Sequence, residues 1–324
     1  MSDVPDRLVR RRAARRAQLR RRRLTALAAT LGLVVLVGAG VSAGFGLGGG
    51  GDQGNGGAPE PEAAEATLPG GGRRILPDRR VVAFYGAPQA AALGVLGIGE
   101  PDRVAKQLER QARPYATKAR PVLPAFELLA VVAADAPGDR DLYRTRQTNA
   151  IIGRYLRAAR RAGAILLLDI QPGRSDFLTE SKALERWLRE PDVSLALDPE
   201  WRMAPDEVPG ETIGSVDASE VNATSQWLSD LTRRERLPQK LLVIHRFTDG
   251  MVENLAALEE QQDIATVINV DGFGSEAQKV AKYRDLEPHR FHAGFKLFYE
   301  EDTGLMTPKR VLRLRPAPEL IVYE

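Results

Sequence analysis

Residues 164–271 decide the fold, because they contain four short apolar runs separated by longer amphipathic stretches. The runs are AILLLDI (Ala164–Ile170), VSLALD (Val193–Asp198), KLLVIHRF (Lys240–Phe247) and ATVINVD (Ala265–Asp271). Continuous apolar runs of this length are typical of strands that are covered on both faces, as in a parallel sheet. The stretches between them have helical periodicity, so this region predicts a repeated strand–helix unit.

The same pattern continues on both sides of this region. Further runs are VVAFY (Val81–Tyr85), VLPAFELL (Val122–Leu129), HAGFKLFY (His292–Tyr299) and ELIVY (Glu319–Tyr323). Helices are predicted over residues 102–111, 145–162, 179–190, 218–236, 251–261 and 276–285, with Asp217 as a helix cap. Eight units in about 250 residues predict an α/β fold, a (β/α)8 TIM-type barrel over residues 73–324. The alternative is an open doubly wound sheet, but the Gly-rich phosphate-binding turn of that fold is missing.

A basic tail and an uncharged segment precede the predicted barrel. Residues 1–23 contain ten Arg and two Asp, and the 24 residues of Leu24–Leu47 carry no charge. As a helix they would extend about 36 Å, enough to cross a hydrocarbon core of about 30 Å. The basic tail places the N-terminus in the cytoplasm and the barrel outside. We therefore predict a single-pass transmembrane anchor in the cell membrane. The alternative is a signal sequence cleaved near Ala43, which would release a secreted protein.

The segment between the anchor and the barrel, residues 48–72, predicts a flexible, disordered linker because Gly, Pro and Glu dominate it. The barrel region, residues 73–324, contains 36 basic and 37 acidic residues, so the chain's net charge of +3 comes from the tail. We therefore expect no nucleic-acid partner. The chain has no Cys, which excludes a thiol nucleophile and a Cys-ligated metal site.

Four consecutive predicted strands end in a titratable residue: Asp169, Asp198, His245 and Asp271. Neighbouring parallel strands lie about 4.8 Å apart. In a barrel of this type the active site lies at the C-terminal ends of the strands. We therefore expect the four side chains to meet at one mouth. The alternative is that each one caps a helix or tethers a loop.

Other polar and aromatic residues lie where they can line the same mouth. Those predicted to bind substrate are Tyr85, Glu127, Gln171, Trp201, His245, Arg246, Lys296, Tyr299 and Glu300. Glu127 and Lys296 are single charges inside apolar runs, and alternatively form an ion pair that fills the barrel. The aromatic rings can stack on a sugar ring, or alternatively pack in the core.

The pair Asp198-Pro-Glu200 favours a glycoside hydrolase that acts on a polysaccharide of the cell envelope or outside the cell. Such an enzyme needs one protonated carboxyl group and one carboxylate. The pair resembles the D-x-E ending of chitinase-like glycosidases, in which the Glu is the acid. A pattern of retaining glycosidases, with a Glu after strand 4 and another at strand 7, would use Glu200 and Glu300, although Pro199 replaces its usual Asn. We predict Glu200 as general acid assisted by Asp198, with Asp169 and Asp271 as partner carboxylate and substrate-binding group.

Two other functions are left open. One is a non-catalytic barrel that binds a polysaccharide or an envelope protein, and the other is a metal-dependent hydrolase with oxygen ligands. His289 and His292 lack the Glu and the helix of an H-E-x-x-H site. We therefore predict neither a resident metal nor a cofactor, and the sequence makes no prediction of the oligomeric state.

Several strings around the strand ends also carry a resemblance. They are LLLDIQPGRSDF, LALDPEWRM, RLPQKLLVIHRF, VDGFG and GFKLFYEED. Together they resemble a largely uncharacterised family of exported, glycosidase-like (β/α)8-barrel proteins of high-GC Gram-positive bacteria. The resemblance extends from about Val81 to Tyr323 and implies export and the barrel fold, but it implies no particular reaction.

Overall fold

The computed structural model describes residues 65–88, 90–286 and 290–324. Eight parallel strands close into a barrel, in the order β1-β11-β10-β9-β7-β5-β4-β2, and β2 pairs with β1 to complete the ring. The strands are β1 (Arg80–Gly86), β2 (Val122–Ala133), β4 (Ile165–Ile170), β5 (Val193–Leu197), β7 (Lys240–Arg246), β9 (Ile264–Val270), β10 (His292–Leu297) and β11 (Leu320–Tyr323). The predicted TIM-type barrel is confirmed by this topology.

The barrel strands are buried on both faces, which explains their continuous apolar sequences. Alternate residues, such as Val81 and Ala83 on β1, point into the ring and pack with Leu167 and Val243. The residues between them, such as Val82, point outward and pack against the helices. This alternation decides which polar residue at each strand end enters the barrel.

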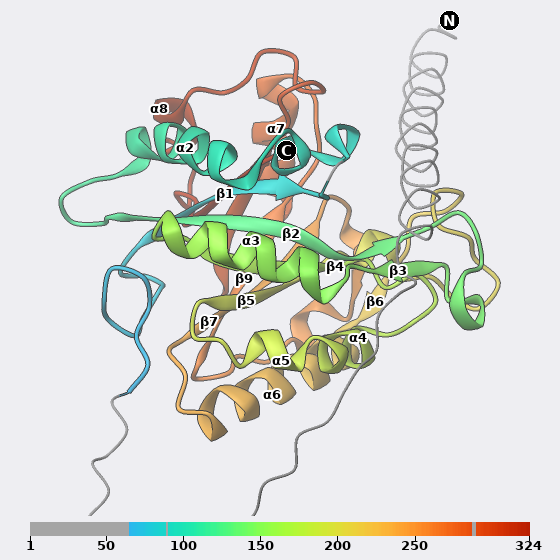
Figure 1. Cartoon of the computed structure of the whole chain (residues 1–324). Helices are drawn as coiled ribbons and strands as arrows, with labels where there is room; N and C mark the ends of the chain where they lie inside the picture. The colour runs from blue at the N-terminus through green and yellow to red at the C-terminus, as the bar shows by residue number, and fades with distance from the viewer. Residues whose placement is uncertain (1–64, 89, 287–289) are drawn as a thin grey trace, which may run out of the picture.

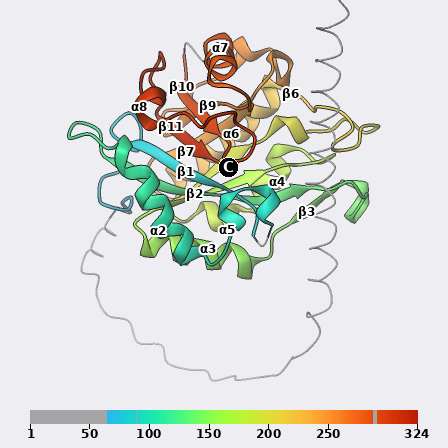
Figure 2. The ribbon, with the colours of Figure 1, turned by 90° about the horizontal axis from the view of Figure 1, so that it is seen from above.

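Helices surround the ring. The α-helices are α2 (Pro101–Ala112), α3 (Asn149–Arg161), α4 (Phe177–Ala183), α5 (Glu185–Leu188), α6 (Ala218–Arg234), α7 (Glu276–Leu286) and α8 (Pro308–Val311). Figure 1 shows α3, α5 and α6 around the strands, and Figure 2 shows α2 and α3 on one side of the sheet with α7 on the opposite side. The predicted cap Asp217 begins α6, where its side chain accepts a hydrogen bond from the Ser219 N–H.

Helix α3 begins later than predicted because Arg144–Arg146 form a short strand, β3, antiparallel to the end of β2. Glu180 on α4 holds this strand, with its carboxylate 2.9 Å from Arg144 Nε and 2.6 Å from Arg146 Nε. Thr148 then caps α3 by accepting a hydrogen bond from the Ile151 N–H. The predicted helix over residues 179–190 is divided at Leu184 into α4 and α5.

The predicted helix over residues 251–261 is wrong. Val252–Glu253 form a two-residue strand, β8, parallel to β6 (Val216–Asp217). Asn254 then adopts a left-handed conformation with φ of 53°, which ends any regular helix. The rest of the segment contains only short 3₁₀ turns, Asp249–Met251 and Leu255–Ala257. The apolar spacing here reflects packing of a loop onto the barrel rather than a helical face.

The end of the predicted linker packs against the barrel. Leu68 in the predicted linker, and Ile75 and Leu76 directly after it, are buried and belong to the same apolar cluster as the interior strand residues. The Arg79 guanidinium donates a hydrogen bond to the Pro69 carbonyl at 2.6 Å. The segment lies at the N-terminal ends of the strands, where the Gln239 N–H, one residue before β7, donates a hydrogen bond to the Arg73 carbonyl at 2.8 Å. Residues 48–64 of the predicted linker lie outside the described residues.

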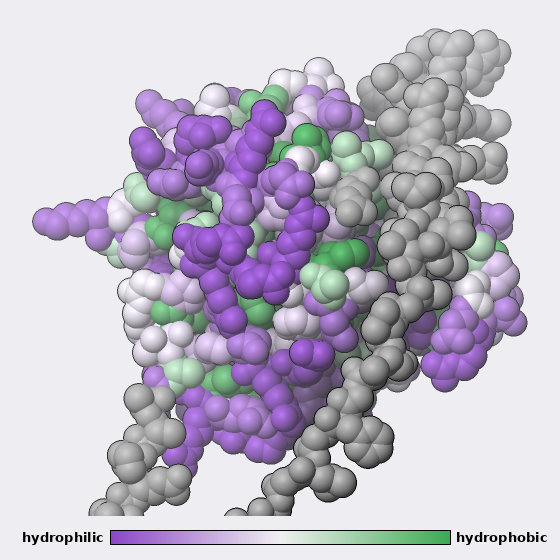
Figure 3. Space-filling model, viewed as in Figure 1, coloured by the Kyte–Doolittle hydropathy of each residue, from purple (hydrophilic) through white to green (hydrophobic). Residues whose placement is uncertain are grey.

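The face of the molecule in Figure 3 is mainly hydrophilic, with small and scattered apolar patches. Within the described residues, no helix has the length and apolar character that a membrane crossing needs. The predicted anchor, residues 24–47, lies outside the described part of the chain, so it stays a prediction.

Candidate active site

The C-terminal end of the barrel interior is filled by polar side chains, one or more from every strand. Along each strand they continue the series of every second residue that points into the barrel. On β1, for example, Tyr85 comes two residues after Ala83 and four after Val81. The members of this polar cluster are Tyr85, Glu127, Asp169, Asp198, His245, Asn269, Asp271, Lys296 and Glu324. The structure therefore brings together the four titratable strand ends that the sequence singled out.

His245 on β7 lies between two carboxylates. Its Nε2 is 2.9 Å from Glu127 Oε1, and its Nδ1 is 3.0 Å from Asp271 Oδ2. Burial alone would lower the pKa of His245, but Asp271 and Glu127 raise that pKa well above its usual value. The raised pKa favours the imidazolium form of His245, in which the two ring N–H groups donate to these carboxylates. A charged ring with both protons engaged cannot serve as a general base.

Lys296 on β10 is a second fixed cation. Its Nζ lies 2.9 Å from Glu324 Oε2, 3.5 Å from Asp271 Oδ2 and 3.6 Å from the centre of the Tyr85 ring. Burial opposes the charge of this ammonium group, but Asp271 and Glu324 outweigh burial and raise its pKa. Lys296 therefore stays charged and cannot act as a neutral amine nucleophile.

Asp271 is held as an ionised carboxylate by these two cations. Burial would raise its pKa, but Lys296 and His245 lower the pKa below the usual value. Asn269, two residues earlier on the same strand face, donates a hydrogen bond from Nδ2 to Asp271 Oδ1 at 2.6 Å. Gly294 on β10 makes room for that amide, since a Cβ there would lie 2.6 Å from Asn269 Oδ1.

Asp169 and Asp198, on the neighbouring strands β4 and β5, behave in the opposite way. Burial raises the pKa of Asp169 to about 6, while His245 lowers that pKa and Glu127 raises it further. Burial and the charge of Asp169 raise the pKa of Asp198 well above its usual value. The two carboxyl groups therefore retain protons at a pH where Asp271 is ionised.

Two polar residues hold this acid pair. The Tyr85 hydroxyl donates to Asp169 Oδ2 at 3.0 Å, and Gln171 Nε2 lies 3.3 Å from both Asp198 Oδ2 and the Tyr85 hydroxyl. Gln171 is positioned in turn by the Ala133 N–H, which donates to its Oε1 at 3.3 Å. Among the described residues, Asp169 Oδ1 has no hydrogen-bond partner although it is buried.

Glu200 and Trp201 lie at the edge of the mouth in a short 3₁₀ turn, Pro199–Trp201, directly after β5. Glu200 is half-buried and lies near enough to Asp198 to raise the pKa of that carboxyl group. Trp201 is also half-buried and packs against the interior apolar cluster. The Gly214 N–H fixes the turn by donating to the Glu200 carbonyl at 2.7 Å.

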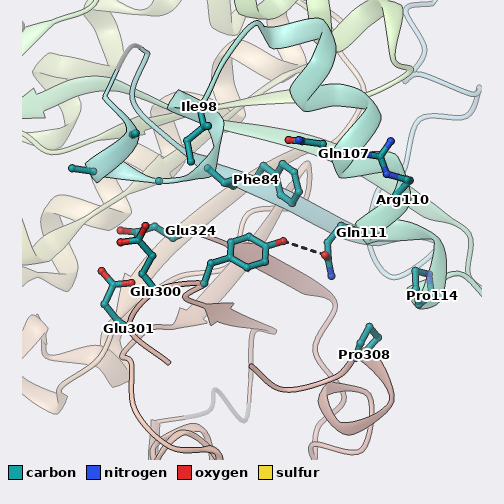
Figure 4. Close-up of a pocket in the computed structure, with 15 residues that line it drawn as sticks. Phe84, Ile98, Gln107, Arg110, Gln111, Pro114, Glu300, Glu301, Pro308 and Glu324 are labelled. Atoms are coloured by element: carbon teal, nitrogen blue, oxygen red, sulfur yellow. Dashed lines mark hydrogen bonds between the residues drawn. The ribbon is translucent and has the colours of Figure 1, made fainter. Parts of the chain in front are cut away.

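Of the predicted substrate-binding residues, Gln171 contacts the polar cluster and Trp201 lies at the edge of the mouth, whereas three others lie away from it. Arg246 follows the inward-facing His245 and so points toward the helices, where its Nη2 lies 2.7 Å from Asp249 Oδ1. Its assignment to the mouth is wrong for this reason. Tyr299 and Glu300 line a separate cavity outside the ring of strands (Figure 4).

The predicted alternative for Glu127 and Lys296 was an ion pair with each other. Glu127 instead lies 2.9 Å from His245 and Lys296 lies 2.9 Å from Glu324, while Glu127 also contributes to the raised pKa of Lys296. Asn269 and Glu324 were missed. Each lies two residues from a position that faces the barrel interior: Asn269 lies two residues before Asp271, and Glu324 lies two residues after Val322. The strand period was therefore a signal that would have found both. In the described part of the chain, no group of three or more Asp, Glu or His side chains is arranged to hold a metal ion.

Comparison with known proteins adds little to this geometry. No protein-family model and no curated protein matches the sequence. Solved structures with some likeness include a hyperthermophilic endo-β-1,4-glucanase in complex with substrate, at 8% identity and a TM-score of 0.39, covering 76% of this chain and 88% of that chain. Another is oxaloacetate acetylhydrolase with the inhibitor 3,3-difluorooxalacetate, at 12% identity and a TM-score of 0.30, covering 75% of this chain and 67% of that chain. Likenesses at this level carry no argument about reaction or substrate, so the class of the protein, an eight-stranded parallel barrel, rests on its strand order.

Proposed function

We propose that the barrel is a glycoside hydrolase that cleaves a polysaccharide with a carboxyl acid and a carboxylate at its mouth. One observation carries the proposal: burial raises the pKa of Asp169 and Asp198, whereas Lys296 and His245 keep the nearby Asp271 ionised. Glycosidic cleavage needs both kinds of carboxyl group in one site. Carboxyl groups whose pKa values are driven apart by their surroundings are typical of such acid and base roles.

Glu200 is the general acid in this proposal. It is half-buried at the edge of the mouth, whereas Asp198 is only 6% exposed, so a glycosidic oxygen reaches Glu200 more easily. Asp198 and Asp169 act behind it as a buried proton-holding pair. Asp271 supplies the ionised carboxylate that stabilises positive charge on the sugar ring, and Gln171 and Tyr85 position the acid pair.

The change Glu200→Gln tests this assignment, because it removes the proton donor and keeps the shape of the side chain. We expect hydrolysis to fall by about 10²–10⁴-fold, the usual contribution of general acid catalysis. The measurement is release of reducing ends from a panel of envelope and plant polysaccharides, with thermal unfolding as a check on the fold. Glu211→Gln, an exposed residue in the same loop, is the matched control. Full activity of Glu200→Gln on a substrate that the wild type cleaves would contradict the proposal.

A second candidate is a non-catalytic polysaccharide-binding barrel. It is favoured by the burial of the acidic groups, since Glu127 and Asp169 are 0% exposed. In that case the wild type retains polysaccharide in a pull-down without releasing reducing ends, and Glu200→Gln binds equally well.

We also propose that residues 24–47 anchor the barrel outside the cell membrane. The uncharged segment and the ten Arg before it support this orientation. Deletion of residues 1–47 should move the protein out of the membrane fraction, and protease added to intact cells should digest the barrel of the full chain. A barrel that stays protected in intact cells but is digested after lysis would contradict the proposed location.

A further inference from the structure

A cavity of about 640 Å³ lies outside the ring of strands, beside β1, helix α2 and the segment after β10 (Figure 4). Its volume is in the range of about 300–1,000 Å³ that is common for small-molecule sites. Helix α8, between β10 and β11, has only four residues, and its Pro308 lines the cavity. None of the roles proposed above uses this side pocket.

Apolar side chains gather at the opening of the side pocket. Ile98 is 52% exposed and Tyr299 is 40% exposed, and both are among the few exposed large apolar residues in the described part of the chain. Scattered exposed apolar residues need no explanation, but two of them lining one cavity indicate a binding surface.

The Tyr299 ring is held in place from behind. It stacks on Tyr323 with ring centres 5.4 Å apart, and meets Phe84 edge-on at 6.4 Å. Its hydroxyl donates to Gln111 Oε1 at 3.1 Å. The ring is therefore a fixed platform with a solvent-exposed part, which lowers the entropic cost of stacking a ligand on it.

Polar groups flank this platform on two sides. Figure 4 places Glu300, Glu301 and Glu324 at one end of the pocket, and Gln107 and Arg110 at the other. A pyranose ring combines an apolar C–H face with hydroxyl groups that both donate and accept hydrogen bonds. Carboxylates accept from such hydroxyls, and amide and guanidinium groups donate to them. Lys296 pairs with Glu324, and the other two carboxylates against the single guanidinium of Arg110 still disfavour an anionic ligand.

The side pocket also touches the polar cluster. Glu324 lines the pocket, and its Oε2 lies 2.9 Å from Lys296 Nζ. Lys296 in turn lies 3.5 Å from Asp271. The pocket is therefore adjacent to the polar cluster, on the side of Glu324 and Lys296.

We propose that the side pocket binds an uncharged saccharide unit, with Tyr299 as the stacking platform. The proposal rests on the proposed function in that the bound unit belongs to the polysaccharide that the mouth cleaves. It deepens that function by naming a neutral, rather than acidic, substrate and a binding subsite outside the barrel ring.

The test is calorimetric titration of soluble gluco-, xylo-, manno- and chito-oligosaccharides, with oligogalacturonate as the acidic probe. Titrations use Glu200→Gln as the parent chain so that no turnover occurs. We expect Tyr299→Ala to weaken binding of a neutral oligosaccharide by about tenfold, and Tyr299→Phe, which keeps the ring, by no more than about twofold.

Ile98→Ala should also weaken binding, and Ile213→Ala is its matched control, because Ile213 is 44% exposed and does not line the pocket. Thermal unfolding of each variant identifies any loss of fold, and Ile98→Ala and Tyr299→Phe still decide the matter if Tyr299→Ala unfolds.

The outcomes separate this inference from the proposed function. Hydrolysis by the wild type together with unchanged affinity in Tyr299→Ala and Ile98→Ala overturns the side pocket and leaves the function standing. Binding that depends on Tyr299 without hydrolysis supports the pocket and overturns the function. Failure of every neutral oligosaccharide to bind, or equally tight binding of oligogalacturonate, overturns the inference.

Discussion

The two ends of the barrel interior differ sharply, although the same strands build both. At the N-terminal end, Leu68, Ile75 and Leu76 pack with Leu241 and Leu320 in an apolar layer. At the C-terminal end, the interior positions of the same strands carry the polar cluster. Apolar burial stabilises the fold, whereas buried ion pairs contribute little net stability and are strongly destabilising when one partner is removed. The difference indicates that the apolar end contributes more to the stability of the fold than the polar end does.

The largest expected effect compares two buried lysines, one at each end. Lys296→Met leaves Asp271 and Glu324 without their cation, and we expect it to lower the free energy of unfolding by about 3–5 kcal/mol. Lys240→Met removes only hydrogen bonds from Nζ to the Glu190 and Val193 carbonyls, and burial already lowers the pKa of Lys240 to about 7. We expect this second change to cost about 1–3 kcal/mol in urea unfolding at pH 8. Equal losses in the two variants would remove the distinction between the ends.

A smaller effect concerns the pH dependence of stability. The folded-state pKa of Asp169, about 6, lies above the ordinary value of 3.8, so the folded protein binds more protons between these two values. Stability should therefore fall as pH rises from about 4 to about 6, by about 3 kcal/mol at most. Asp169→Asn should reduce this fall in urea unfolding measured across that window, and Asp198 should account for part of what remains. A profile identical to that of the wild type would contradict the raised pKa.

Asp271 provides the internal control because its shift has the opposite sign. Its folded-state pKa lies below the usual value, so its contribution to stability is present above about pH 4 and is lost as pH falls through the lowered pKa. Asp271→Asn should therefore alter the profile below about pH 4. The two windows do not overlap, which separates the acid pair from the ionised carboxylate in one experiment.

The smallest expected effect comes from Tyr85→Phe. In the wild type, the Tyr85 hydroxyl donates to Asp169 and lowers the pKa of that carboxyl group. Removal of the hydroxyl should therefore raise the pKa of Asp169 and move its pH window upward, with a stability loss of about 1 kcal/mol. Tyr155→Phe is the matched control, since its buried hydroxyl donates to the Leu96 carbonyl instead. It should show a similar loss of stability with no movement of the window.

Much of the fold was predictable because strands covered on both faces have continuous apolar sequences. All eight barrel strands have such runs, and the strand period of two also determines which residues face inward. Applied strictly, that period would have separated the inward His245 from the outward Arg246, and would have added Asn269 and Glu324 to the cluster. The failure at Met251–Gln261 has a different cause, since pairing of β8 with β6 and the left-handed Asn254 are contacts that helical periodicity does not encode.

The charge state of the candidate site was less accessible from sequence. That Asp169 and Asp198 hold protons while Asp271 does not depends on which carboxyl groups lie beside Lys296 and His245. Those distances depend on how the neighbouring strands are staggered around the ring. The spacing of residues along the chain does not determine this stagger. The side pocket was unpredictable for a related reason, because segments that are far apart in the sequence form it together.

The docking of Leu68, Ile75 and Leu76 under the barrel has a geometric consequence for any upstream tether. These residues close the end of the ring that is opposite to the polar cluster. Any segment that precedes residue 65 is therefore attached at the floor of the barrel, at the end opposite to the rim that carries the polar cluster. A tether at the floor leaves the rim, and with it the polar cluster, free of the chain that leads to the barrel.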